Sequence, residues 1–222
     1  MVDLSSDLRP ESVAANLRRV RETIADAGRD PAEVAVLAAV KYLPLESLHA
    51  LHEGGVTLVG ENRAQALAAK QAAVGGSSGP FTWDFIGALQ SRKVKDIVGR
   101  VRWIHSVASD SALSQLARHA SPDTEVLVEV NVAGEGAKSG VAPAELPGFL
   151  ERCPVTVVGL MTMPPRVAAA EDNRRHFAAL AALAGDHGLS QLSMGTSQDY
   201  AVAAAEGATI VRLGTILYER TA

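Results

Sequence analysis

The sequence has little of what would tie it to a nucleic acid, a membrane or a disulfide framework. Its 222 residues include one cysteine, Cys153, so no disulfide can form within the chain and no cysteine-rich metal site can be built. A formal net charge of −4 gives no basic footprint for nucleic acid or an anionic membrane. No apolar run approaches the roughly 18 residues of a membrane span, and the polar amino terminus is unlike a signal peptide. We therefore expect a cytoplasmic protein that uses no metal ion.

Aromatic residues are also scarce, at 4%, but hydrophobic residues make up 47% of the chain and can fill a sizeable core. They are arranged as apolar runs that alternate with amphipathic segments, a pattern that predicts parallel strands joined by helices. We expect strands at 34–41, 56–62, 81–87, 102–107, 125–132, 155–163, 191–195 and 209–215. We expect helices at 10–28, 45–51, 64–74, 91–98, 110–119, 143–150, 170–184 and 197–206.

Eight such units in one chain favour a closed (β/α)8 TIM barrel, an α/β fold, preceded by the extra helix at 10–28. We expect residues 1–222 to form this single domain. The alternative is a doubly wound open sheet, which would leave two of the strands out of register with the pattern.

The first strand ends in a lysine, Lys41, directly after a run of buried-type residues. The carboxyl ends of barrel strands are where such barrels carry out their chemistry. Burying an ammonium is costly, and a desolvated lysine has a lowered pKa and can become the neutral amine that forms a Schiff base. The alternative is that Lys41 extends its ammonium to solvent.

The turns after the last two strands offer groups that suit a phosphate. The first runs from Ser193 through Gly195 to Ser197, which we expect at the N-cap of a helix whose amino terminus attracts anions. The second is Gly214-Thr215, and barrels commonly bind phosphate at these two turns. A lysine that can form an imine opposite a phosphate site is what pyridoxal 5'-phosphate (PLP) requires. Arg212, on the last strand, could reach the pyridine nitrogen.

Several motifs in a fixed order also resemble a known family. They are Val40-Lys41, Gly60-Glu61-Asn62, Phe85 to Lys93, His105-Ser106-Val107, Val130-Asn131-Val132 with Lys138-Ser139-Gly140, Gly159-Leu160-Met161, Leu192 to Gly195, and Val211 to Thr215. From about residue 10 to 218 the chain resembles the PLP homeostasis proteins, the YggS/PROSC family, whose single barrel is similar to the amino-terminal domain of bacterial alanine racemase. The chain departs from the family pattern at Val40, Ala88, Arg92 and Thr196.

The resemblance implies PLP as the cofactor, held as an imine on Lys41. It implies phosphate contacts at Ser197, Gly214 and Thr215 and a pyridine-nitrogen contact at Arg212. Three residues at strand ends complete the candidate cofactor-binding set: Asn62, Asn131 and Met161. His105, also at a strand end, is interpreted as a barrel histidine with its hydrogen bonds satisfied, and no residue is assigned a catalytic role.

We therefore expect an intracellular PLP reservoir or carrier that exchanges PLP with apo PLP-dependent enzymes, acts as a monomer and has little or no turnover. The alternative is a PLP-dependent amino-acid racemase, with Tyr42 as the candidate base. Racemases of this fold take an opposed acid/base group from a second, β-rich domain, and we expect no such domain here. An arginine also cannot give the pyridine a proton. A Schiff-base aldolase without a cofactor would need neither both phosphate turns nor Arg212.

Overall fold

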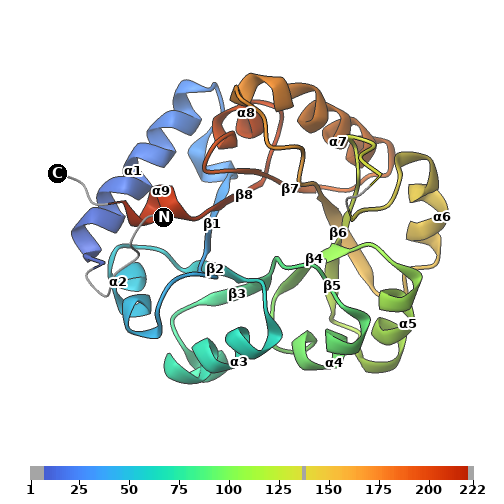
Figure 1. Cartoon of the computed structure of the whole chain (residues 1–222), viewed down its shortest axis with the longest axis horizontal. Coiled ribbons are helices and arrows are strands. Elements are labelled where there is room, and N and C mark those ends of the chain that lie inside the picture. The colour runs from blue at the N-terminus through green and yellow to red at the C-terminus, as the bar shows by residue number, and fades with distance from the viewer. Residues whose placement is uncertain (1–7, 137–138, 220–222) are drawn as a thin grey trace.

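The computed structural model describes residues 8–136 and 139–219, so Lys138 of the fifth motif lies outside the described residues. Eight parallel strands form a closed barrel in chain order, β1 to β8 (Figure 1). The strands are β1 Ala35–Ala39, β2 Leu58–Glu61, β3 Thr82–Phe85, β4 Trp103–Val107, β5 Glu125–Glu129, β6 Thr156–Met161, β7 Gln191–Thr196 and β8 Ile210–Leu213. β1 pairs with β8 as well as with β2, which confirms the barrel and excludes the open sheet.

Helices surround the barrel on the outside (Figure 1). They are α1 Pro10–Asp26, α2 Leu48–Glu53, α3 Ala64–Ala73, α4 Val94–Ile97, α5 Asp110–His119, α6 Leu146–Glu151, α7 Arg174–Asp186, α8 Tyr200–Ala205 and α9 Thr215–Tyr218. Within the part of the chain that the structure describes, none of them is long and apolar enough to cross a membrane.

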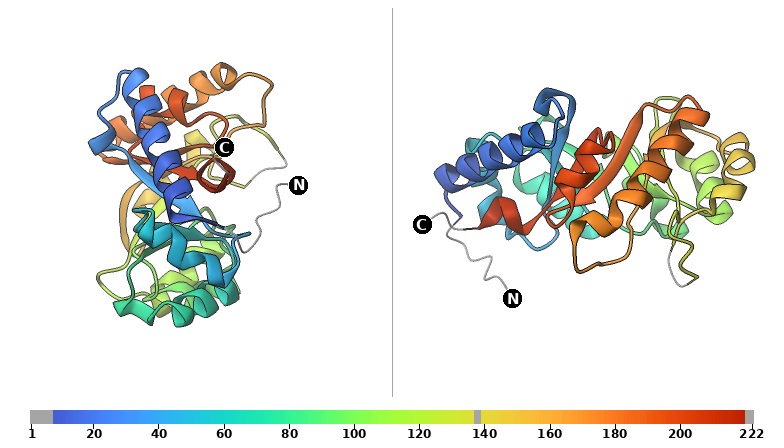
Figure 2. Two further views of the ribbon diagram at one scale, coloured as in Figure 1. Left: turned by 90° about the vertical axis from the view of Figure 1, so that its left-hand side faces the viewer. Right: turned by 90° about the horizontal axis from the view of Figure 1, so that it is seen from above.

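The extra helix α1 packs on the end of the chain. Its apolar face, with Val13 and Ile24 fully buried, turns inward as the helical spacing predicts. Figure 2 shows α1 beside α9. The side chain of Asn16, fully buried on α1, donates hydrogen bonds to the carbonyl oxygens of Leu217 at 3.1 Å and Glu219 at 2.8 Å. The first and last helices are therefore fastened to each other.

Several strands end earlier than the sequence pattern predicted. β1 ends at Ala39 rather than at Lys41, because the N–H of Leu43 bonds back to the carbonyl of Val40 and turns the chain. The last strand was predicted to reach Thr215, which is wrong: β8 ends at Leu213, and Thr215 begins α9. Lys41 and Gly214 therefore lie just beyond the strands, and Thr215 lies at the start of a helix.

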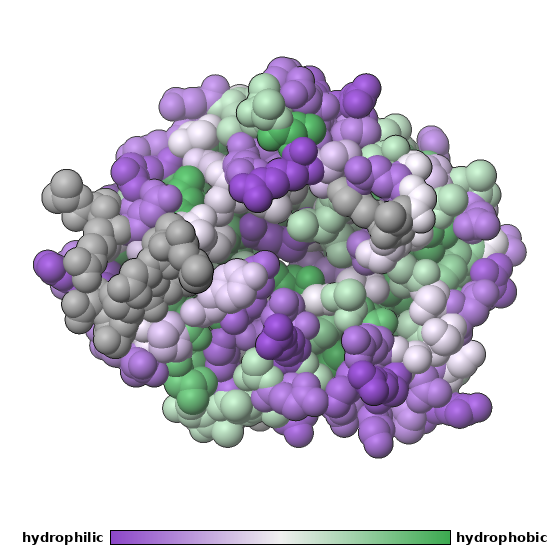
Figure 3. Space-filling view, viewed as in Figure 1, coloured by the Kyte–Doolittle hydropathy of each residue, from purple (hydrophilic) through white to green (hydrophobic). Residues whose placement is uncertain are grey.

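The interior of the barrel is unusually polar. Side chains inside such barrels are mostly branched and apolar, yet Asp84, His105, Ser193 and Arg212 are all buried here, on β3, β4, β7 and β8. Figure 3 shows that polar side chains also gather around the centre of the face seen in Figure 1. A buried polar group is costly unless it is hydrogen-bonded, so these four need partners inside the barrel.

Candidate cofactor-binding site

A cavity of about 480 Å³ opens where the carboxyl ends of β1 and β8 meet. Cavities of this size commonly hold small molecules and cofactors. Six of the eight residues that the sequence predicted line it: Lys41, Asn62, Ser197, Arg212, Gly214 and Thr215. The chain brings them together from opposite ends because β1 closes the barrel against β8.

Lys41 lies in the turn after β1 and is exposed. The expectation of a lysine desolvated at a strand end is therefore wrong, because the strand stops two residues earlier. The ammonium of Lys41 is 4.9 Å from the centroid of the Tyr42 ring, within the range of a cation–π contact. Tyr42 is itself 72% exposed, so the amine of Lys41 is accessible from solvent at the mouth of the cavity.

Among the described residues a buried lysine is found instead on α3, Lys70, which sequence reasoning missed. Its ammonium donates to the carbonyl of Val40 and lies 2.8 Å from a carboxylate oxygen of Glu61. The other oxygen of Glu61 accepts hydrogen bonds from the backbone N–H groups of Asn62 and Arg63. This buried pair therefore holds the backbone on both sides of the cavity wall, just before Lys41 and at Asn62. The sequence signal was Glu61, a glutamate at the end of a buried strand, because a buried carboxylate needs a cation as its partner.

The two candidate phosphate turns contact each other directly, because the Gly214 N–H donates to the Ser197 hydroxyl at 3.2 Å. Ser197 was predicted to be a helix N-cap, which is wrong. Asp199 immediately precedes α8, and its carboxylate accepts from the N–H of Thr196 at 2.7 Å and from its hydroxyl at 3.0 Å. The Ser197 hydroxyl is therefore directed toward the Gly214 turn.

The space in front of Gly214 is open. A Cβ added there would approach no protein atom closer than 3.9 Å, the carbonyl oxygen of Ala39, so the cavity extends to the backbone of this turn. The hydroxyls of Ser197 and Thr215 can donate hydrogen bonds, which phosphate oxygens accept, and the Gly214 N–H, which donates to Ser197 here, lies beside them. The residues present therefore fit a phosphate group.

Arg212, on β8, reaches the cavity from inside the barrel and is 6% exposed. Its Nη1 donates to the Ser193 hydroxyl at 2.6 Å and its Nη2 to the carbonyl of Thr162 at 2.8 Å. Burial lowers the pKa of Arg212 to about 10, and the charges of Glu129 and Asp199 act in the opposite direction. The guanidinium is therefore a cation at neutral pH, in a fixed orientation.

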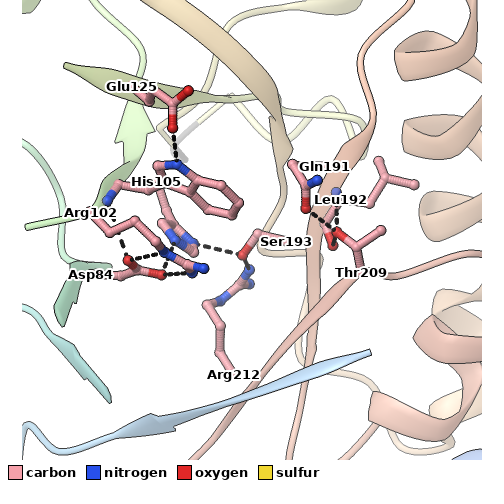
Figure 4. A network of polar contacts seen from close by, with 10 residues as sticks. Asp84, Arg102, His105, Glu125, Gln191, Leu192, Ser193, Thr209 and Arg212 are labelled. Atoms are coloured by element: carbon pink, nitrogen blue, oxygen red, sulfur yellow. Dashed lines mark hydrogen bonds and ion pairs between the residues drawn. The ribbon is translucent and has the colours of Figure 1, made fainter. Parts of the chain in front are cut away.

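A chain of polar contacts continues from Arg212 into the barrel (Figure 4). Nδ1 of His105 is 2.8 Å from the Ser193 hydroxyl, and its Nε2 is 3.0 Å from Oδ2 of Asp84. Arg102 donates to both oxygens of Asp84, at 3.0 and 2.6 Å. His105 is thus a barrel histidine with both nitrogens satisfied, as interpreted from the sequence. The roles of Asp84 and Ser193 were missed, although an aspartate within a buried strand is itself a signal.

The charges of this chain are set by burial and by its own hydrogen bonds. Burial lowers the pKa of His105, and the Asp84 carboxylate offsets this only in part, so the imidazole is neutral. Burial raises the pKa of Asp84, but the hydrogen bonds from His105 and Arg102 outweigh it and hold the pKa below its usual value. Asp84 is therefore ionised beside a neutral histidine.

Two predicted residues do not line the cavity. The side chain of Asn131 donates to the carbonyl of Glu135 at 2.9 Å and accepts from its N–H at 3.2 Å, so it closes the loop after β5. Met161 is buried at the end of β6, and the methionine at the cavity is Met163, 48% exposed.

Comparisons with known proteins agree with this geometry. The family model described as the alanine racemase, N-terminal domain, matches residues 8–221, so the fold and site define a barrel of that class. The Pyridoxal phosphate homeostasis protein of Pseudomonas aeruginosa is 38% identical over 217 residues, 94% of each chain. That of Aquifex aeolicus is 37% identical over 94% of this chain and 96% of its own. This chain belongs to the family of pyridoxal phosphate homeostasis proteins.

A solved structure extends the comparison. PipY of Synechococcus elongatus, determined with PLP bound, is similar with a TM-score of 0.78 and 31% sequence identity, over 93% of this chain and 100% of that chain.

Proposed function

We propose that this protein binds PLP in the cavity as a Schiff base on Lys41 and serves as an intracellular reservoir or carrier of the cofactor. The observation that carries the proposal is that an accessible lysine, a buried arginine and two donor-rich turns line one cavity of about 480 Å³. The names of the relatives and the PLP bound to PipY support the choice of PLP over other phosphorylated aldehydes.

Each lining residue has a distinct part in holding the cofactor. When PLP is bound, its aldehyde supplies carbonyl chemistry and its pyridine ring supplies an electron sink. Lys41 would hold the aldehyde carbon through a C=N bond, formed with loss of one water. The hydroxyls of Ser197 and Thr215, with the Gly214 N–H beside them, would hold the phosphate, and Arg212 would donate to the pyridine nitrogen. An arginine keeps its proton, so the ring remains a weaker electron sink than a protonated pyridine.

The groups around the cavity favour storage over turnover. Among the lining residues that the structure describes, the titratable groups are Lys41, Tyr42, Arg212 and Tyr218. The Tyr218 hydroxyl donates to the carbonyl of Ala39 at 3.1 Å, and burial raises its pKa, so it keeps its proton and cannot serve as a base. Tyr42 is the remaining candidate base of a racemase-like enzyme, but it is exposed to solvent at the mouth. The same exposure leaves the Schiff base open to exchange with an apo-enzyme.

Borohydride trapping tests the proposal. Protein incubated with PLP should absorb in the near-visible, and reduction should fix the cofactor on the peptide that contains Lys41. Lys41→Ala should abolish the label, and Lys70→Met should still be labelled at Lys41, which separates the two lysines. Labelling elsewhere, or no uptake of PLP, would contradict the proposal.

Turnover and transfer are then measured on the loaded protein. Incubation with L- and D-amino acids, and separately with an apo PLP enzyme, should give transfer without turnover. Racemisation at about 1 per second or faster, abolished by Lys41→Ala, would favour the racemase-like alternative.

A further inference from the structure

We infer that Arg102, Asp84, His105 and Ser193 form a positioning relay through the barrel that fixes Arg212 toward the cofactor; this rests on the proposed binding of PLP. The relay joins four strands or their ends, from Arg102 just before β4 to Arg212 on β8 (Figure 4). Arg212 alone of the five lines the cavity.

The hydrogen bonds of the relay have only one consistent direction. An arginine can only donate, so the Ser193 oxygen accepts from Nη1 of Arg212. An ionised carboxylate can only accept, so Nε2 of His105, which faces Asp84, carries the imidazole proton. In a neutral imidazole Nδ1 is then an acceptor, and the Ser193 hydroxyl donates to it. The tautomer of His105 is thus determined by Asp84, and the direction of the Ser193 hydrogen bond follows from it.

The charges agree with this direction. A protonated His105 would place a second cation across one hydroxyl from the Arg212 guanidinium. Arg102 prevents this, because its two hydrogen bonds to Asp84 balance the carboxylate that would otherwise favour imidazolium. Arg102 therefore acts on the cofactor site through three intervening side chains, without touching the cavity.

The location of the relay argues against a purely structural role. Apolar residues would fill the barrel at lower cost, because buried charged and polar groups are often replaced by apolar ones without loss of stability. Four interior positions instead carry polar side chains, and each of these is hydrogen-bonded to the next. The end of that series at the cavity is the guanidinium proposed to contact the pyridine ring.

The test uses PLP labelled with ¹⁵N in the pyridine ring, bound to the full-length protein. The ¹⁵N chemical shift reports the hydrogen bond at that nitrogen, and equilibrium dialysis reports PLP affinity. Ser193→Ala removes the link, and Ser193→Thr keeps the hydroxyl. Arg102→Met cuts the remote end, where the side chain is one-third exposed, and Arg100→Met, two residues earlier and exposed, is the matched control.

Ser193→Ala should weaken PLP binding about tenfold, the lower end of what loss of an outer partner costs at metal sites, and should move the ¹⁵N shift. Ser193→Thr should restore the shift, Arg102→Met should move it in the same direction as Ser193→Ala, and Arg100→Met should leave it unchanged. A purely structural role would lower thermal stability but not move the shift.

Ser193→Ala and Arg102→Met proteins that hold PLP with wild-type affinity and an unchanged ¹⁵N shift would overturn the relay and leave the proposed function intact. A wild-type protein that takes up no PLP would overturn both.

Discussion

Lys70→Met should destabilise the protein far more than removal of a cation from the surface. The side chains of Lys70 and Glu61 are 7% and 1% exposed, so the substitution leaves a buried carboxylate whose remaining partners are the N–H groups of Asn62 and Arg63. Breaking a buried ion pair in this way costs about 3–5 kcal/mol. Since domains are stable by about 5–15 kcal/mol, this is a fifth or more of the free energy of unfolding.

Two further variants separate the ion pair from other effects of the substitution. Arg29 lies 3.1 Å from Glu33 with side chains 33% and 56% exposed, so Arg29→Met should cost less than about 1 kcal/mol. The double variant Glu61→Gln/Lys70→Met carries no unpaired charge and should be more stable than Lys70→Met alone. With the single variant Glu61→Gln also measured, the departure of the double variant from the sum of the two single variants gives the coupling energy of the pair.

Urea denaturation of protein stripped of PLP, followed by far-UV circular dichroism, measures these free energies, and an unchanged slope shows that the unfolded state is comparable. Lys70→Met should also retain PLP less well, because the Val40 carbonyl, just before Lys41, loses the hydrogen bond from the Lys70 ammonium. A cost below about 1 kcal/mol for Lys70→Met, or a double variant as unstable as the sum of its single variants, would refute the reasoning.

Further predictions concern the phosphate turns and pH. Ser197→Ala should weaken PLP binding by about 1–2 kcal/mol, the scale of a hydrogen bond to a charged group, measured by equilibrium dialysis; unchanged affinity would move the phosphate elsewhere. Gly214→Ala should weaken PLP binding without lowering the stability of the cofactor-free protein, because the added methyl enters the cavity. Gly195→Ala should do the opposite and lower that stability, since Gly195 has φ of +90° and a Cβ there would lie 2.6 Å from that of Ala203; equal thermal midpoints for both alanine variants would contradict this. Because burial lowers the pKa of His105 below its unfolded value near 6.5, the unfolded state binds protons more readily, and stability should fall as pH drops below that value. His105→Gln should remove that part of the fall, measured as urea midpoints against pH, and an identical pH profile would refute the assignment.

The barrel was predictable because strand and helix periodicity is local. Lys41, Arg212 and Gly214 could be chosen from residue type and position, since parallel strands of a barrel end on one face. The contacts that hold them could not. Whether Lys70 reaches Glu61, or His105 reaches Ser193 across the barrel, depends on strand tilt and side-chain direction, which periodicity does not encode.

Local hydrogen bonding explains the remaining errors. Asn131 was chosen as a polar strand end, but an asparagine side chain can bond to nearby backbone instead, and here it bonds to Glu135. Asp199 likewise took the place before α8 that the sequence analysis assigned to Ser197, because its carboxylate binds both donors of Thr196.

The fastening of α1 to α9 determines when the cavity can first exist during synthesis. The side chain of Asn16 donates to two backbone carbonyls that follow it in the sequence by 201 and 203 residues. The pairing of β1 with β8 likewise cannot form until β8 has been synthesised. Between Lys41 and Thr215 the ribosome adds 215 − 41 = 174 residues, which takes roughly 9 to 35 s at bacterial and eukaryotic elongation rates. Throughout that interval the nascent chain carries the lysine without the complete pair of turns proposed to bind the phosphate. Loading with PLP is therefore expected to follow translation, as a property of the completed barrel.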